Sequence, residues 1–474
     1  MSIINYNWNS ESYVKSGSER VITCTSNSIV GNFKYRFYLE IIYDGQTYSY
    51  TFRPNASGYG LININKILQS IVQPISVQQV LTVPDADTSL LVNDFQQNIH
   101  SMPHFKFAGT GHNPQYISTG GTTVKRVLVK LWDFYANNAT DVPTKQNAPQ
   151  QNYYYVFSGQ GKSTDLINEL YTNFKLTGNS SEFISPLYTE KVGNGNIYST
   201  DVDLTDYGTI SIFNRTQVVN GSADPYRLFI TYYDADDNIL AQQGLLNSAT
   251  YGGEYNSGAG VTNDSMILTF GCFPANLNKL PATFNRPSDY SALAYYYVGF
   301  LNSTNQSRSA YYKFNVVDRC KKYDTQRFAY INSMGVWEYI TFNKKRTDKL
   351  SNKKTEIKSS VFDYSRAYAT ITPDEYKEGS YVPGVAHESR VVKSSNIKSS
   401  FTINTGFLKP HEILKVKEMF LAPKISYINT DGTAIAVILT NPNIDDVVVS
   451  HRYEQTEYKL NFEYSVPKHN PIIF

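Results

Sequence analysis

The 474-residue sequence has few cysteines and no long apolar run. Cys24, Cys272 and Cys320 are far apart, odd in number and without a Cys-x-x-Cys spacing, which argues against a disulfide framework or a zinc knuckle. We expect them to be small, buried residues with free thiols. The N-terminus has neither a basic start nor an apolar run, and no stretch approaches the ~20 apolar residues of a membrane helix. We therefore expect no signal peptide, and folding in a reducing cytoplasm.

Charge is also scarce, at 18% of the residues, and the net charge is only +2. This balance argues against a polyanionic or cationic partner recognised by bulk electrostatics. The chain is instead rich in tyrosine, with 39 copies, and tyrosine favours half-buried strands and contact surfaces. The length allows about three domains, and the composition predicts a mostly β protein with a large adhesive surface.

Alternating aromatic and polar residues predict paired strands along the chain. Phe33–Tyr43 alternates over its whole length, and Asp44-Gly45 is a strong hairpin signal before a return strand. The same pattern recurs at 226–233 with 239–240, and at 295–301 with 311–317. We expect stacked antiparallel β-sandwich modules. The expected domains are 1–190 with long loops, 200–319, and 320–474.

Other stretches of the N-terminal half give further predictions. Residues 61–72 predict a strand running into a short helix, and 124–135 and 153–157 predict strands. Between these two strands, the Pro-, Asn- and Gln-rich residues 136–151 predict an exposed loop. Residues 164–174 predict a short helix, and 175–200 predict a linker.

The C-terminal part predicts a mixed α+β module. Pro410 suits a first helical position and Glu412 adds favourable charge to the first turn, so we expect a helix at 410–421. An antiparallel meander should follow, with Asp431-Gly432 at one turn. Its expected strands are 425–428, 434–439, 446–453 and 456–464.

The most distinctive stretch is 320–342, which predicts a hairpin closed at Asn332 and Gly335. Its aromatic side chains Tyr330, Trp337 and Tyr339 are candidates for anchors of a core or of an interface, and we favour the core. A basic stretch follows from Lys344, Lys345 and Arg346 to Lys358. We expect a solvated or protein-facing surface there, with nucleic acid contact as the alternative.

Three motif-like patterns do not meet the requirements of their chemistry. The segment 159–164 has Val156 where a phosphate-binding loop needs its first glycine. Asp234, Asp236 and Asn238 lack the later glycine and glutamate of a calcium loop, so we expect a polar hairpin turn. His100, His104 and His112 are interrupted by Pro103, which opposes a shared helical face for a metal.

Enzyme chemistry has no recognisable signature in the sequence. A GxSxG elbow is absent, and Glu254, Asp289 and Asp363 are carboxylates that spacing alone cannot pair across a cleft. We therefore assign no catalytic residue, no cofactor and no metal ligand, and we expect no enzyme activity.

Three parts of the chain resemble virion proteins of tailed phages that infect Bacteroidota, including crAss-like phages. In the central hairpin of that family an aromatic residue, Leu-Asn and Gly-Gly-Trp surround the turn, and here Val336 replaces the second glycine. The N-terminal module and the C-terminal helix with its following meander are similar to the opening module of these proteins and to the end of phage tail and ring components. The residues that carry the resemblance are Cys320–Tyr323, Tyr330–Tyr339 and Phe342, then Tyr35–Gly45, Phe52–Asn55 and Gly58–Gly60, and finally Phe407–Ile425.

The resemblance implies a structural protein of the virion, in a ring or layer of the tail, collar or baseplate. Its implied partners are copies of itself and neighbouring portal, tail or ring proteins, with incidental contact to packaged DNA left open and no membrane. Such a protein is made in the host cytoplasm without a signal peptide. The main alternative is a fibre or adhesin that binds host glycans, and a depolymerase ranks third.

Overall fold

The computed structural model describes residues 3–5, 13–17, 20–74, 80–81, 106–107, 117–119, 123–159, 189–192, 195–213, 227–246, 267–278, 285–302, 304–307, 309, 311–317, 322–358, 390–408, 410–430, 432–441, 447–450 and 455–465. The structure is 56% strand, with three α-helices in this part of the chain, which confirms the mostly β prediction.

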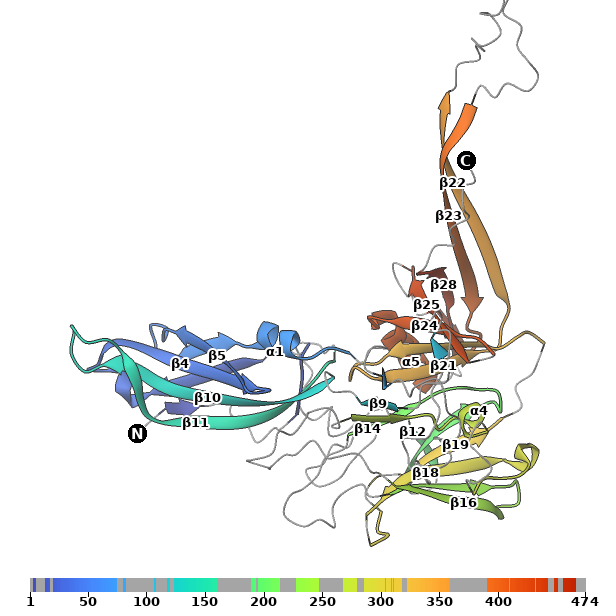
Figure 1. The fold of residues 1–474 in the computed structure, drawn as a ribbon, viewed down its shortest axis with the longest axis horizontal. Coiled ribbons are helices and arrows are strands. Elements are labelled where there is room, and N and C mark those ends of the chain that lie inside the picture. The colour runs from blue at the N-terminus through green and yellow to red at the C-terminus, as the bar shows by residue number, and fades with distance from the viewer. Residues whose placement is uncertain are drawn as a thin grey trace, which may run out of the picture.

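Two sheets and a helix share one core in the N-terminal region (Figure 1). The first sheet has the order β1 (Ile3–Asn5), β3 (Val21–Ser26), β6 (Gly60–Asn63). The second has the order β2 (Tyr13–Lys15), β11 (Thr144–Phe157), β10 (Val124–Ala136), β4 (Phe33–Tyr43), β5 (Gln46–Phe52). The short helices are η1 (Asn27–Ile29) and α1 (Asn65–Ile71).

Strand β4 follows its sequence pattern. Phe37, Leu39 and Ile41 are fully buried, while the residues between them are partly exposed. Asp44 and Gly45 both have positive φ, 47° and 73°, as a two-residue hairpin turn requires. The predicted hairpin is confirmed, as is the strand and short helix expected at 61–72.

The loop expected at 136–151 is confirmed at 137–143, which is largely exposed, but is wrong over 144–151, because β11 begins at Thr144. Its first half pairs with the end of β10 across a bulge, since Leu131 faces Gln150 whereas Asp133 faces Gln146. The bulge contains Asn147, with φ of 63°, and Pro149. A bulge tolerates both residues, and this half of the strand is largely exposed, so its sequence looks like a loop.

The second region also contains two sheets. One has the order β12 (Thr189–Val192), β13 (Gly195–Val202), β19 (Tyr312–Val316), β18 (Tyr295–Leu301), β15 (Arg227–Tyr233), β16 (Ile239–Leu246). The other has the order β14 (Ile210–Phe213), β17 (Ile267–Phe270), β9 (Ile117–Thr119), β7 (Val80–Leu81). The helices here are α4 (Pro274–Leu277) and η5 (Tyr290–Ala292). Strands β12 and β13 show that the expected linker is wrong over 189–192 and 195–200.

The C-terminal region has one large sheet and a confirmed helix, α5 (Pro410–Leu421). The order of the sheet is β21 (Trp337–Phe342), β20 (Gln326–Ile331), β24 (Ile425–Ile428), β25 (Thr433–Leu439), β28 (Lys459–Tyr464), β23 (Arg390–Asn404), β22 (Arg346–Lys358), and β8 (Lys106–Phe107) also pairs with β25. A separate pair is β26 (Val447–Ser450) with β27 (Gln455–Glu457). The meander predicted after the helix is therefore confirmed in its main strands.

Short strands from 80–119 connect these regions. β7 and β9 belong to a sheet of the second region, and β8 pairs with the C-terminal sheet. The expected domain ranges 1–190, 200–319 and 320–474 stay predictions. Residues 80–119 fall in the first expected domain, but their short strands pair with strands of the other two regions. Cys24 and Cys272 are buried free thiols, as expected.

Several predictions fall outside the described residues. These are the helix at 164–174, the motif residues 160–164, Cys320, the three histidines, Glu254 and Asp363.

Candidate functional site

The central hairpin of β20 and β21 is buried on both faces. Phe328 and Tyr330 point into the core of the C-terminal region, together with Ile340 and Phe342 of the return strand. The alternate residues Ala329, Ile331, Trp337 and Tyr339 lie in the core of the second region. Alternation along a strand sends successive side chains to opposite faces, so this one hairpin is shared by two cores.

The three aromatic candidates therefore lie in the cores of the protein. Tyr330, Trp337 and Tyr339 are 0%, 6% and 5% exposed. The Tyr339 hydroxyl lies 2.6 Å from Thr209 Oγ1 of the second region. Burial raises the pKa of Tyr339, which keeps this hydroxyl neutral.

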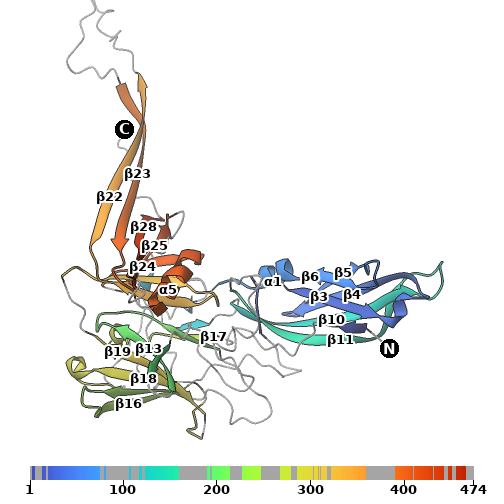
Figure 2. The same cartoon turned by 180° about the vertical axis from the view of Figure 1, so that it is seen from behind.

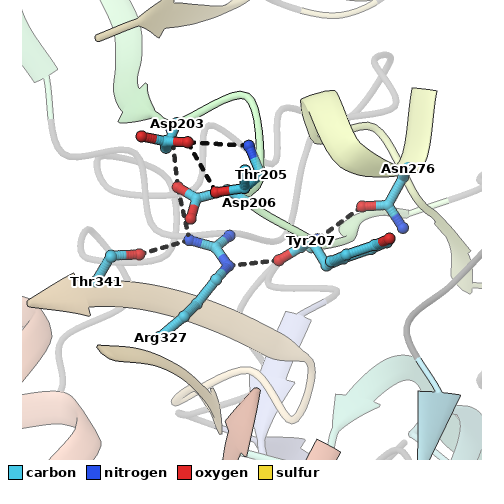
Figure 3. A network of polar contacts seen from close by, with 8 residues as sticks. Asp203, Thr205, Asp206, Tyr207, Asn276, Arg327 and Thr341 are labelled. Carbon is cyan, nitrogen blue, oxygen red and sulfur yellow. Dashed lines mark hydrogen bonds and ion pairs between the residues drawn. The ribbon is translucent and has the colours of Figure 1, made fainter. Parts of the chain in front are cut away.

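Arg327 of β20 fastens the hairpin to the loop that follows β13 (Figure 3). Its Nη1 lies 3.2 Å from Asp206 Oδ2 and donates to Thr341 Oγ1 at 2.7 Å, while Nε donates to the carbonyl of Tyr207. The guanidinium carbon lies 4.6 Å from the centre of the Phe273 ring. This buried cation is paired, hydrogen-bonded and stacked, as a charge in a core must be.

The turn of the hairpin meets the end of β11. Asn332 Oδ1 accepts hydrogen bonds from the backbone N–H groups of Met334 and Val336. Gly335 has φ of 84°, and a β-carbon there would lie 2.2 Å from the carbonyl oxygen of Ser158. Only glycine fits this position, because both the backbone conformation and the close approach exclude a side chain. The turn thus brings the N-terminal region against the same hairpin.

Helix α5 covers the hairpin from the C-terminal side. Glu418 Oε1 accepts a hydrogen bond from the backbone N–H of Ser333 at 2.7 Å, and Lys415 Nζ lies 3.3 Å from Glu338 Oε1. Glu338 and Lys415 are both buried, and Glu338 Oε2 has no hydrogen-bond partner among the residues that the structure describes. Burial raises the pKa of Glu338, and Lys415 partly opposes this shift.

A two-stranded ribbon of β22 and β23, which we name the arm, extends away from the body (Figures 1 and 2). At its base Phe401 and Ile403 are buried, and residues 400–404 also pair with β28. Farther out, β22 is the only described strand that pairs with β23, and every residue from Thr347 to Glu356 is exposed. A strand of 13 residues spans about 40 Å. The arm is therefore rooted in a core and unsupported along most of its length.

The two strands of the arm are strongly basic. They contain eight basic and two acidic residues, a net charge of +6, whereas residues 359–389 between them carry −3 and the rest of the chain −1, which together give the +2 of the whole chain. Lys349 and Lys353 share one face with Ser351, and Lys398 lies opposite Ser351 on the same face. Leu350, on the other face, is 70% exposed.

A groove of about 780 Å³ lies at the base of the arm. Arg346 enters it with its guanidinium carbon 4.2 Å from the ring centre of Phe401, and it donates to Asp348 at 2.6 Å and to the Tyr464 hydroxyl at 2.7 Å. Lys345 and the rings of Tyr323 and Tyr427 also line the groove. Aromatic faces beside polar groups of this kind can hold a sugar or a protein side chain.

The structure separates the six candidate residues into two sites. Tyr330, Trp337 and Tyr339 lie in the cores, while Lys344 and Lys345 are exposed and Arg346 is half-buried at the base of the arm. Sequence reasoning missed Arg327, whose partner comes from another region. It also missed β23, although 398–404 alternates polar with apolar or small residues as a strand does.

Comparisons with known proteins add no family: no protein-family model matches the chain, and no curated protein matches it significantly. Among the described residues, no group of three His, Cys, Asp or Glu side chains is placed to hold a metal ion. No helix in this part of the chain is long and apolar enough to span a membrane.

Proposed function

We propose that the protein is a structural component of a phage particle, which forms a ring or layer of the tail, collar or baseplate through contacts between subunits. The observation that carries this proposal is the arm of β22 and β23. An isolated two-stranded ribbon is only marginally stable in water, because each strand has one neighbour and little apolar area is buried. A long ribbon held out from the body gains stability when it lies on another subunit.

The outer edge of the arm favours binding to one specific partner, because it is protected against pairing with the strand edges of other proteins. Among the described strands, β22 is the last of its sheet, so its outer edge has no neighbouring strand. The exposed Lys349, Lys353 and Lys354 oppose edge-to-edge aggregation, since charged edge residues are a common protection. Such an arm stays soluble until it meets a complementary surface.

The finer architecture belongs to the same proposal. We take the paired sheets of the N-terminal and second regions to be stacked β-sandwich modules, and the C-terminal region to be the α+β module. Two sheets with a shared apolar core in the N-terminal region support this arrangement. The central hairpin would hold the modules in one fixed subunit while the arm reaches a neighbour.

The remaining parts of the proposal follow from the resemblance to virion proteins of phages that infect Bacteroidota. The protein would be made in the host cytoplasm and incorporated into the virion beside portal, tail or other ring proteins. It would act without a cofactor, a metal or enzyme chemistry. Contact of the basic arm with packaged DNA would be incidental.

The second candidate is a fibre or adhesin that binds host glycans, and the groove at the base of the arm favours it. Tyr323 and Tyr427 offer ring faces, and Asp324, Arg346 and Asn429 offer hydrogen-bonding groups at the same groove. Sugars bind such combinations of stacking and polar contacts. A structural subunit, in contrast, needs the arm and not the groove.

Negative-stain electron microscopy and mass photometry of the purified chain distinguish these functions. Closed rings with a central hole would support the collar or ring component, and a discrete trimer would favour the fibre. A strictly monomeric chain would contradict ring closure without other virion proteins. A variant in which residues 350–399 are replaced by Asn-Gly should lose self-association, while Val142→Ser, an exposed change on the β10–β11 loop, should keep it.

A further inference from the structure

The sheet containing β15 and β18 has one face in the core and one face outside. Tyr232 and Tyr296 point inward and are fully buried, whereas their neighbours Tyr233, Tyr295 and Tyr297 point outward and are only partly buried. The rings of Tyr233 and Tyr295 stack at 4.9 Å between centres, and Tyr297 packs edge-on against both. We name these three side chains the tyrosine face.

The tyrosine face already holds one ammonium group. Lys313 Nζ of β19 lies 4.0 Å from the ring centre of Tyr295 and 5.8 Å from that of Tyr297. A cation over an aromatic face is attracted by the negative potential of the ring. The tyrosine face is therefore suited to lysine side chains. Its third ring, that of Tyr233, lies on the neighbouring strand β15.

Carboxylates border the tyrosine face. Asp237 Oδ1 accepts a hydrogen bond from the Tyr295 hydroxyl at 2.6 Å, and Asp236 precedes it in the exposed turn between β15 and β16. Hydrogen bonds from Asn238 lower the pKa of Asp234 in the same turn, which keeps that carboxylate ionised. Asp201 is exposed on β13. It pairs with Asn315 of β19, and Asn315 pairs with Tyr295 of β18, so the three residues form one row across the sheet. Acidic groups thus lie beside a surface that accepts cations.

The arm carries complementary groups at a matching spacing. Lys349, the pair of Ser351 with Lys398, and Lys353 follow one another at steps of two residues, so their charges recur about every 7 Å along one face. Tyr295 and Tyr297 are also two residues apart on one strand, which gives the same repeat on the tyrosine face. The +6 charge of the two arm strands is opposite in sign to the carboxylates that border the tyrosine face.

The arm of a chain does not lie near its own tyrosine face. In both views the arm leaves the C-terminal sheet on one side of the body, and β15, β16 and β18 lie at the opposite end (Figures 1 and 2). A contact between them therefore joins two chains. It uses different surfaces on the two partners, which is a heterologous contact.

We propose that the tyrosine face, with Asp201 and Asp236 at its border, is the docking surface for the lysine-bearing arm of a second copy of this chain. The inference rests on the proposed function, because it identifies the two surfaces through which subunits would assemble. The ammonium groups of Lys349 and Lys353 lie over the tyrosine rings and near the carboxylates, while Lys398 between them keeps its ion pair with Glu463. Each chain donates one arm and accepts another, so the contact repeats from subunit to subunit.

The test uses two full-length variants, one for each side of the contact. The arm variant carries Lys349→Glu and Lys353→Glu, and the face variant carries Asp201→Lys and Asp236→Lys; all four positions are exposed. Each variant alone should associate at least about tenfold more weakly than the wild type, because like charges oppose each other across the contact. Lys66→Glu, a reversal on exposed helix α1, is the matched control and should associate like the wild type.

Mixing the two variants gives the decisive measurement. In the mixture opposite charges meet at both kinds of contact, because the unchanged arm of the face variant meets the unchanged face of the arm variant and the two reversed surfaces also meet each other. Sedimentation velocity of the mixture should therefore show association restored toward the wild-type level. Higher salt should weaken it, since screening reduces attraction between charges. Thermal unfolding of each variant verifies that the fold is retained.

Each result bears on a different part of the inference. Wild-type association that neither variant weakens would overturn the docking assignment and leave the proposed function standing. A wild-type chain that stays monomeric at its highest soluble concentration would overturn the docking assignment together with ring closure by this chain alone. Variants that associate normally but lose binding to a glycan library or to duplex DNA would assign these surfaces to sugar or nucleic acid instead.

Discussion

Arg327 and Asp206 form a buried ion pair between the central hairpin and the second region, with their side chains 8% and 4% exposed. Arg327→Met should destabilise the protein by about 3–5 kcal/mol, because it leaves Asp206 buried without its cation. Lys398→Met is the matched control, since Lys398 pairs with Glu463 at the surface and should contribute less than about 1 kcal/mol. Urea unfolding of both variants measures the difference. Equal losses would contradict the assigned role of Arg327.

Gly335 and Gly31 test whether the hairpin turn needs glycine for its packing as well as for its backbone. Both have positive φ, 84° and 89°, but a β-carbon at Gly31 would meet nothing within 4 Å. Gly31→Ala should cost about 1–2 kcal/mol for the left-handed conformation. Gly335→Ala should cost about 2–5 kcal/mol, since it also collides with the Ser158 carbonyl. Thermal and urea unfolding would refute the close approach if the two variants were equally stable.

The Glu338–Lys415 pair predicts a pH-dependent variant. Burial raises the pKa of Glu338 above its ordinary value of 4.5, so its contribution to stability is complete below that value and is lost as the pH rises through the raised pKa. Lys415→Met removes the opposing charge and raises this pKa further. We expect a loss of about 3–5 kcal/mol near neutral pH, with partial recovery toward pH 4.5.

The measurement for this pair is the free energy of unfolding as a function of pH. The double variant Glu338→Gln/Lys415→Met is the control, because without the carboxyl group the extra pH dependence should disappear. A single Lys415→Met variant whose loss did not change with pH would show that Glu338 is not the titrating group.

Phe401 and Leu350 lie on the same ribbon but in different surroundings. Phe401 is 1% exposed in the aromatic core at the base of the arm, and Leu350 is 70% exposed farther out. Phe401→Ala should cost about 3–5 kcal/mol through loss of packing, whereas Leu350→Ala should change stability by less than about 0.5 kcal/mol. Hydrogen exchange should likewise show slower amides in β20 and β21 than in the outer part of β22. Uniform protection along β22 would contradict an unsupported arm.

Local sequence patterns predicted those elements whose partners are near in the chain. The alternation of Phe33–Tyr43, with Asp44-Gly45 directly after it, fixes both a strand and its return. The helix Pro410–Leu421 was likewise predictable from its first turn and its apolar spacing. In both cases the residues that determine the element lie within it or beside it.

Elements that depend on distant partners were not predictable. The first half of β11 is polar and contains Pro149, and it becomes a strand because β10 provides backbone partners on both sides of the bulge. In the sequence, Arg327 lies in an ordinary strand pattern, and only the fold brings Asp206 next to it. The aromatic candidates of the hairpin were identified, but nothing local indicated that alternate residues serve two different cores.

The shared hairpin also constrains the order in which the protein can mature on the ribosome. The core that holds Ile230 and Phe314 also contains Trp337, and it is completed by Ile428 and Ala434 from near the C-terminus. A nascent chain that has emerged only through the second region therefore still exposes apolar surface. Translation must proceed at least through Ala434 before that surface is covered, so products that end before this residue should be captured by chaperones or degraded rather than accumulate as separate stable fragments.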